Sequence, residues 1–206
     1  MSASYQKFSG LLGIVTGLAG LLYLGFFVAL KNPAALPAAL SLLVVGICGS
    51  AVIVALYQLV RKVDEGFALW GLLLGIAGAG GAAIHSAFDV ASNLHPPATP
   101  FDYASPIDPR GFLTFAVAGL GAIVVSWLIL RGSVLPRAVG YLGIVAGLLL
   151  IALYVAYLVL LNATDPLVLG LVLISGIVQP VWYLSVGWSL LQGETARVGR
   201  RVATAR

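Results

Sequence analysis

The feature that most constrains this chain is a series of six long apolar runs that carry almost no charge. A bilayer core about 30 Å thick is crossed by roughly 20 apolar residues in a helix, and a helix pairs its own backbone polar groups there. We therefore predict an all-α, polytopic membrane protein, a compact bundle of six transmembrane helices. The predicted helices are residues 8–30, 36–60, 67–91, 111–130, 138–161 and 167–191.

The composition agrees with this fold class. Hydrophobic residues make up 61% of the chain and charged residues only 9%, whereas a soluble domain needs far more charge to cover its surface. Once six spans are placed, no stretch of the 206 residues is left for a separate soluble domain. We expect residues 1–206 to form a single transmembrane domain that ends in a basic tail at 192–206.

The basic residues predict the orientation. Four connections between the runs are short, so antiparallel hairpins are expected, and both termini then lie on one side of the membrane. Nine of the 11 lysines and arginines fall on that side, namely Lys7, Arg61, Lys62, Arg131, Arg137, Arg197, Arg200, Arg201 and Arg206; the other two are Lys31 and Arg110. The positive-inside rule places both termini in the cytoplasm. The same asymmetry explains the net charge of +4 without nucleic acid, and the tail can contact anionic lipid.

A faint internal repeat runs through the chain. Residues 10–18, GLLGIVTGL, and 140–148, GYLGIVAGL, share seven residues at an offset of 130 positions. The same offset pairs Asn32 with Asn162, and LGI recurs at residues 74–76. Since glycine, leucine, isoleucine and valine dominate membrane helices, chance matching is one explanation. The other is a parallel repeat of three helical hairpins.

Polar residues recur at one-turn intervals near the end of the third apolar run. His85, Asp89 and Asn93 are spaced i, i+4, i+8 in GAAIHSAFDVASN and so share one helix face. Because ionisable groups inside a membrane normally face protein or water, one hypothesis is a polar pocket that opens outward. The alternatives are that Asp89 and Asn93 already lie among the headgroups, or that the stripe is a structural contact between helices.

Three tyrosines are predicted at a depth similar to that of His85, on the first and fifth helices. They are Tyr23, Tyr154 and Tyr157. Each alone is typical of an aromatic belt at the membrane surface. Together with His85 they are candidate lining residues of the outward pocket.

The sixth run carries a second polar signal, SGIVQPVWYLSVGW. Gln179 lies near the predicted membrane midplane, and Tyr183 follows it by one turn on the same face. Pro180 removes a backbone donor and disturbs the helix. Two roles remain open for Gln179: it could form a structural hydrogen bond that supports a kink, or it could bind a solute. The proline-rich connection at 92–110 could act as a lid or as a docking surface.

No motif for nucleotide binding or nucleophilic catalysis is present, and two histidines with one cysteine make a metal cluster improbable. A cofactor is unknown from sequence; a single histidine ligand to a haem or chlorin is open but unsupported.

The segments VALYQLVRKVDEGFALWGLLLGI, PRAVGYLGIVAGLLL and QPVWYLSVGWSLLQG resemble a bacterial family of small multi-span membrane proteins known only as a domain of unknown function. The resemblance covers most of the chain. It implies a bacterial inner-membrane protein of about six helices and assigns no activity to any residue.

Three functions are compatible with these patterns. The first is a non-enzymatic accessory or binding bundle, whose outward pocket engages a lipid, a small molecule, a partner membrane protein or a second copy. The second is a small secondary transporter or proton-linked permease, although the only acidic candidate, Asp89, lies far from the midplane. The third is an intramembrane enzyme in which His85 is the base and Asp89 orients it, although no nucleophile or second acid stands out in the sequence.

Overall fold

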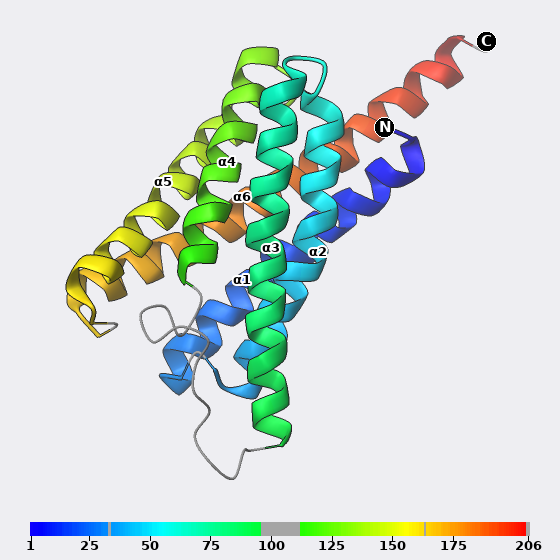
Figure 1. Cartoon of the computed structure of the whole chain (residues 1–206). Helices are drawn as coiled ribbons and strands as arrows, with labels where there is room; N and C mark the ends of the chain where they lie inside the picture. The colour runs from blue at the N-terminus through cyan, green and yellow to red at the C-terminus, as the bar shows by residue number, and fades with distance from the viewer. Residues whose placement is uncertain (33, 96–111, 163, 205–206) are drawn as a thin grey trace.

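The computed structural model describes residues 1–32, 34–95, 112–162 and 164–204. This part of the chain is folded into six helices: α1 (Ala3–Leu30), α2 (Leu36–Val60), α3 (Glu65–Leu94), α4 (Phe112–Gly132), α5 (Arg137–Leu160) and α6 (Pro166–Thr204) (Figure 1). All six contain segments long and apolar enough to cross a membrane. The predicted all-α, six-helix membrane architecture is confirmed, and the chain is a multi-pass membrane protein.

Helix ends differ from the predicted ones where a polar side chain caps the helix. α3 begins at Glu65 because the Asp64 carboxylate accepts a hydrogen bond from the backbone N–H of Phe67 at 3.2 Å. Ser2 similarly caps α1 and accepts from the N–H of Tyr5. α6 continues to Thr204, so most of the predicted tail extends the last helix beyond its apolar span at Pro166–Gly193.

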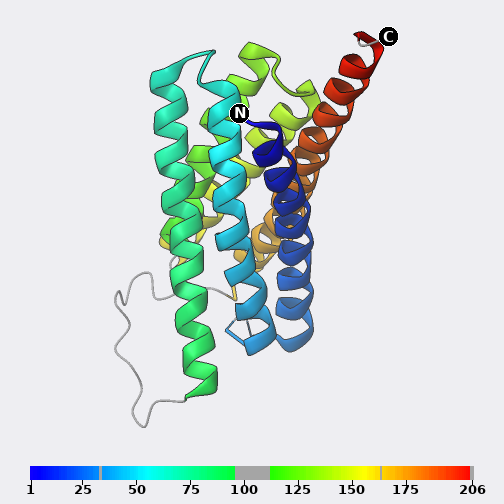
Figure 2. The same cartoon turned by 90° about the vertical axis from the view of Figure 1, so that its right-hand side faces the viewer.

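The helices pack in chain order around a ring. Each one lies against its neighbours in sequence, and the ring closes where α6 packs against α1. The N-terminus and the C-terminal end of α6 lie at the same end of the bundle (Figures 1 and 2). We call this the terminal end and the opposite one the distal end. The three antiparallel hairpins α1–α2, α3–α4 and α5–α6 therefore stand side by side, as the hairpin repeat predicts.

A glycine on each odd-numbered helix packs tightly against the even-numbered helix before it in the ring. A Cβ atom added to Gly13 would lie 2.7 Å from the Cα of Gly187, and one added to Gly75 would lie 2.7 Å from the Cγ2 of Ile53. These distances are too short for real Cβ atoms, so only glycine allows the approach. The three corresponding contacts are Gly13 with Gly187, Gly75 with Ile53, and Gly143 with Ser126.

The first and third hairpins also share their turn geometry. Lys31 and Leu161, which are 130 positions apart, both end their helix in the left-handed conformation, with φ of 52° and 48°. After each, an asparagine side chain accepts a backbone N–H two residues on: Asn32 from Ala34 at 3.1 Å and Asn162 from Thr164 at 3.0 Å. The offset of the sequence repeat is thus reproduced in three-dimensional structure.

The best-packed core lies in the terminal half of the ring and is built by the even-numbered helices. Each supplies three fully buried large side chains that follow one another on one face: Val52, Leu56 and Val60 on α2, Val125, Leu128 and Ile129 on α4, and Trp182, Val186 and Leu190 on α6. The odd-numbered helices supply mainly glycine and alanine at their buried positions. Bulky residues therefore fill the core while small residues let the helices close around it.

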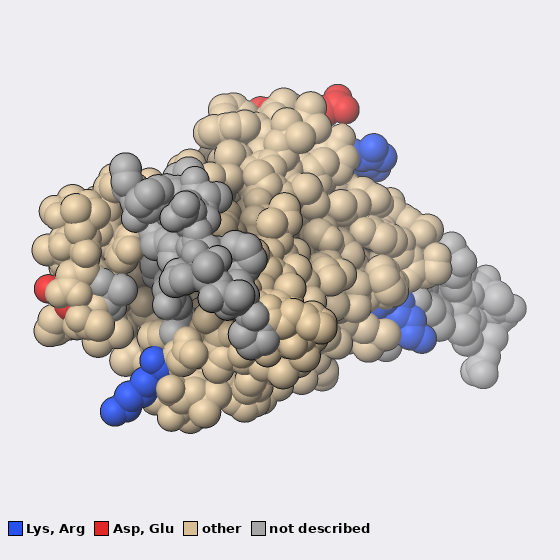
Figure 3. Space-filling model, turned by 60° about the horizontal axis from the view of Figure 1, so that its bottom comes forward, with Lys and Arg blue, Asp and Glu red and all other residues tan. Residues whose placement is uncertain are grey.

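The outer wall of the bundle is apolar. Only 22–50% of each spanning segment is buried inside the structure, and exposed side chains include Leu22, Ile47, Leu73, Ile84 and Val159. Figure 3, which brings the distal end forward, shows a surface with few charged groups among the described residues. An apolar surface of this extent is incompatible with water and fits lipid.

We expect Gly13→Ala to lower the free energy of unfolding by about 1–3 kcal/mol, because its methyl group would meet the backbone of α6. Gly25→Ala, on the same helix with no atom within 4 Å of its Cβ, is the matched control. It should leave stability unchanged or raise it by up to about 1 kcal/mol. Thermal unfolding in detergent distinguishes the two, and equal effects would show that the close approach is not required.

Candidate functional site

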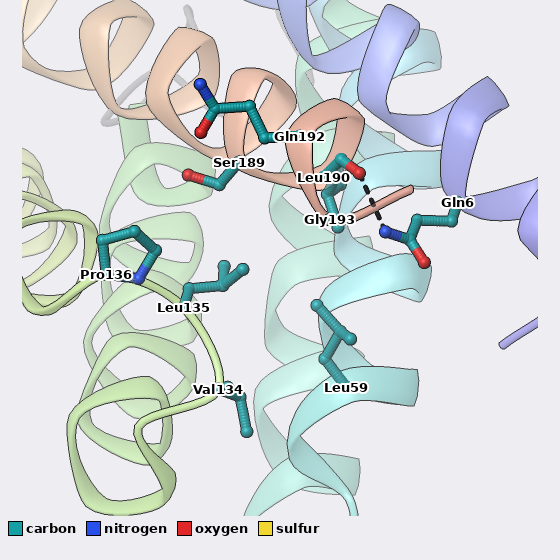
Figure 4. Close-up of a pocket in the computed structure, with 9 residues that line it drawn as sticks. All are labelled: Gln6, Leu59, Val134, Leu135, Pro136, Ser189, Leu190, Gln192 and Gly193. Atoms are coloured by element: carbon teal, nitrogen blue, oxygen red, sulfur yellow. Dashed lines mark hydrogen bonds between the residues drawn. The ribbon is translucent and has the colours of Figure 1, made fainter. Parts of the chain in front are cut away.

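A cavity of about 320 Å³, which we call the terminal pocket, opens at the terminal end. It lies between the first turns of α1, the end of α2, the α4–α5 connection and the end of the α6 span (Figure 4). Its lining residues are Gln6, Leu59, Val134, Leu135, Pro136, Ser189, Leu190, Gln192 and Gly193. The walls are mostly aliphatic, and the polar groups are confined to α1 and α6.

Gln6 fixes the relation between the two helices that bear these polar groups. Its side chain is 5% exposed, and its Nε2 donates a hydrogen bond to the carbonyl of Leu190 at 2.8 Å (Figure 4). The Ser189 hydroxyl donates to the carbonyl of Ser185 at 2.7 Å and keeps acceptor capacity. No charged residue is among the described residues that line the pocket. Such a lining suits a ligand with an apolar body and an uncharged polar head.

Sequence reasoning missed the terminal pocket. Its residues come from four segments that are far apart in the chain, and no spacing pattern connects them. The available signal was Gln6, an amide near the start of an otherwise apolar helix. Polar residues are common at helix ends, so the sequence alone does not distinguish Gln6. Its burial and its hydrogen bond to α6 appear only in the folded structure.

A second and smaller cavity, the central cavity, has a volume of about 40 Å³ and lies inside the ring. Small and aliphatic residues of α2, α3 and α4 form most of its wall. The polar lining comes from one turn of α6, which contributes Gln179, Trp182 and Tyr183. Two residues of the predicted site, Gln179 and Tyr183, therefore share a cavity.

Gln179 is at the middle of the Pro166–Gly193 span, as the sequence predicts. Pro180 follows it inside the helix and cannot donate to the carbonyl of Gly176. α1 accommodates the proline with glycine: a Cβ on Gly20 would lie 2.7 Å from the ring Cγ of Pro180. The polar turn of α6 thus lies where its backbone ladder is interrupted and where α1 packs closely against it.

A pair of buried polar groups lies beside this turn. The Ser126 hydroxyl and the Trp182 indole Nε1 are both buried and form no hydrogen bond within the described structure. Both approach the same position on α5, since a Cβ on Gly143 would overlap Ser126 and lie 2.5 Å from the Trp182 nitrogen. Seven other helical serines and threonines donate to the carbonyl four residues earlier. The Ser126 hydroxyl does not, so the bundle centre contains hydrogen-bonding capacity that its own backbone leaves unused.

The polar stripe of α3 lies at the distal end. His85 is half-buried, one turn beyond Ala82, which lines the central cavity, and it makes no hydrogen bond with the described residues. Asp89 is half-buried and has an interaction partner. Asn93 has a structural contact, because its Nδ2 donates to the carbonyl of Ala34 at 2.7 Å and to that of Asp89 at 2.8 Å. The outward pocket itself stays a prediction.

The three predicted tyrosines lie on α1 and α5, not on the helix that carries His85. Tyr23 on α1 and Tyr154 and Tyr157 on α5 are half-buried, and α1 and α5 pack on the two sides of α6. None of the three lines either cavity among the described residues. Of the connection at 92–110 predicted as a lid, residues 92–94 belong to α3, and residues 96–110 lie outside the described part of the chain. No group of three metal-ligating side chains occurs among the described residues.

Asn93→Ala should weaken the attachment of α3 to the α1–α2 turn, because the donor to the Ala34 carbonyl is lost. We expect a loss of about 0.5–1.5 kcal/mol in the free energy of unfolding and faster hydrogen exchange at the start of α2. Asn93→Asp, which keeps the shape but cannot donate, should behave in the same way. If Asn93→Asp matches the unmodified protein while Asn93→Ala does not, the contact acts through packing.

Comparison with known proteins does not add a function to this geometry. The chain matches no protein-family model, no curated protein and no solved structure.

Proposed function

We propose that this protein is a non-enzymatic integral membrane protein that binds a lipid or an amphipathic small molecule in the terminal pocket. The observation that carries the proposal is a pocket of about 320 Å³ with aliphatic walls and a few polar groups at one side. Ligand sites in proteins are typically about 300–1,000 Å³ and combine apolar walls with a few placed polar groups.

The lining chemistry narrows the class of ligand. Leu59, Val134 and Leu135 offer only dispersion contacts, which suit an acyl chain or an apolar ring. The Gln192 amide and the Ser189 hydroxyl can hydrogen bond a carbonyl, ester or hydroxyl group. Because the described lining has no cation, a bare phosphate would be unpaired inside it. An uncharged, hydrogen-bonding head is the better match.

We further propose that the membrane is the bacterial plasma membrane and that the terminal end faces the cytoplasm. The positive-inside rule supports this orientation. Aromatic side chains gather at the same end, where Phe67 and Trp127 pack edge to face at 5.2 Å and the guanidinium of Arg131 lies 5.4 Å from the Trp127 ring centre. Aromatic and basic residues of this kind mark a membrane–water interface. The terminal pocket is then reached from the cytoplasmic leaflet, opposite the pocket predicted near His85.

A small secondary transporter is the second candidate function. The central cavity favours it, because transporters bind their solutes near the midplane beside interrupted helices, and Gln179 with Pro180 provides both features. The described lining of that cavity contains no carboxylic acid to couple solute and proton movement. Proteoliposomes whose proton uptake is the same with and without the protein would count against a proton-linked permease.

Filling the terminal pocket should displace its ligand. Val134→Trp places a large ring in the lining, and Val145→Trp makes the same change on the exposed face of α5. We expect native mass spectrometry of the full chain, released from nanodiscs of bacterial polar lipid, to show bound lipid or small molecule in the unmodified protein and Val145→Trp. The adduct should be reduced at least about tenfold in Val134→Trp, as for a loss of about 1.4 kcal/mol or more in binding.

Equal adducts in both tryptophan variants would place the ligand elsewhere. Adducts absent from all three proteins would contradict the binding function itself. The same spectra report whether a second copy or another membrane protein is associated, which is the remaining form of the accessory hypothesis.

The orientation can be tested with single cysteines. In a Cys48→Ser background, Ser133→Cys lies in the exposed α4–α5 connection and Thr164→Cys in the exposed α5–α6 turn. A membrane-impermeant maleimide should label Thr164→Cys in intact cells from which any outer membrane has been removed. Ser133→Cys should react only after permeabilisation. The opposite pattern would reverse the proposed topology.

A further inference from the structure

The central cavity contains more hydrogen-bonding groups than the protein itself satisfies. Gln179 provides two donors and an acceptor, and Tyr183 provides a hydroxyl. Neither side chain makes a hydrogen bond with the described residues. Tyr183 is only 7% exposed and Gln179 lies at the middle of its span, so bulk water does not solvate them as it would on a soluble protein.

The surroundings cannot supply the missing partners. Apart from the polar turn, the described lining consists of glycine, alanine, aliphatic residues and one phenylalanine: Leu42, Val45, Gly46, Ile53, Gly75, Gly78, Ala79, Ala82, Phe115, Ala118 and Ala122. These side chains carry no polar atom, and the backbone groups of a regular helix are already paired. Gln179 is half-buried, and a glutamine amide in the apolar middle of a span is costly unless something hydrogen bonds it. A small polar partner is therefore required inside the cavity.

The size and charge of the cavity limit what that partner is. A volume of about 40 Å³ exceeds the roughly 10–15 Å³ that one water needs and is close to the volume of one or two waters. A larger solute does not fit without movement of the helices. No charged residue is among the described lining residues, so an ion would not be compensated.

We propose that the central cavity is a second binding site, which holds one or two water molecules hydrogen bonded to the Gln179 amide and the Tyr183 hydroxyl. The water completes the polar turn of α6 at the membrane midplane, next to Pro180. This site is independent of the terminal pocket, which lies at the terminal end of the same helix.

Nuclear magnetic resonance on the full chain in nanodiscs can detect this water. With glutamine labelled with nitrogen-15, the four side-chain amides are those of Gln6, Gln58, Gln179 and Gln192, and Gln179→Leu identifies the signal of interest. We expect cross-relaxation between the Gln179 amide protons and long-lived water. Gln192, which is exposed, serves as the positive control for contact with mobile water.

Ala82→Val provides the decisive comparison, because it adds volume to the cavity wall and keeps Gln179. The water signal at Gln179 should be lost in this variant. Tyr183→Phe, which removes one partner without adding volume, should weaken it, and this variant decides the matter if Ala82→Val does not fold. No water signal at Gln179 in the unmodified protein, or a signal unchanged in the variants that fold, would overturn the proposal.

Discussion

The close approach of each odd-numbered helix to the even-numbered helix before it, made possible by glycine, recurs around the whole bundle. In lipid, helices gain little from apolar burial against one another, so association relies on packing at short range. Gly13 against Gly187, Gly75 against Ile53 and Gly143 against Ser126 are three versions of one contact. Repeating it around the ring brings α6 back onto α1 and closes the fold without a strand or a disulfide in the described residues.

The distribution of bulky and small residues between the helices also explains where the interior is densely packed and where it contains a cavity. Bulky side chains of α2, α4 and α6 meet inside the terminal half and fill it. Farther along the ring axis, α3 contributes glycine and alanine from Gly75 to Ala82, and these small residues leave the central cavity opposite Gln179. The small residues thus have two effects. They allow the helices to pack closely, and they leave Gln179 beside a cavity instead of in contact with neighbouring side chains.

The sequence predicted the fold well because its signals are local. Each span is located by an apolar run and by the charged or proline-containing segment that ends it. The 130-residue offset of the sequence repeat correctly relates the turns after Lys31 and Leu161. The prediction that Gln179 and Tyr183 share a face was also local, and both line one cavity. The terminal pocket could not be predicted, since Gln6 and Leu190 are 184 positions apart and only the ring closure unites them. Asn93 is an example in which a local pattern was suggestive but the contact is long-range. Its spacing from His85 and Asp89 suggests a shared pocket, but its amide donates to the Ala34 carbonyl in the α1–α2 turn.

α6 contributes the polar lining of the central cavity and part of that of the terminal pocket. Ser189 and Leu190 line the terminal pocket, while Gln179 and Tyr183 line the central cavity. At 1.5 Å per residue, Tyr183 and Ser189 are about 9 Å apart along the helix axis. Between them the helix is pressed against α1 at Gly13 and Gly17, so this segment can move little relative to α1. Its backbone ladder is interrupted only at Pro180. The residues of α6 that line the terminal pocket therefore lie on the half of the helix that follows Pro180, and the interruption of its backbone ladder lies at the polar turn in the middle of the span.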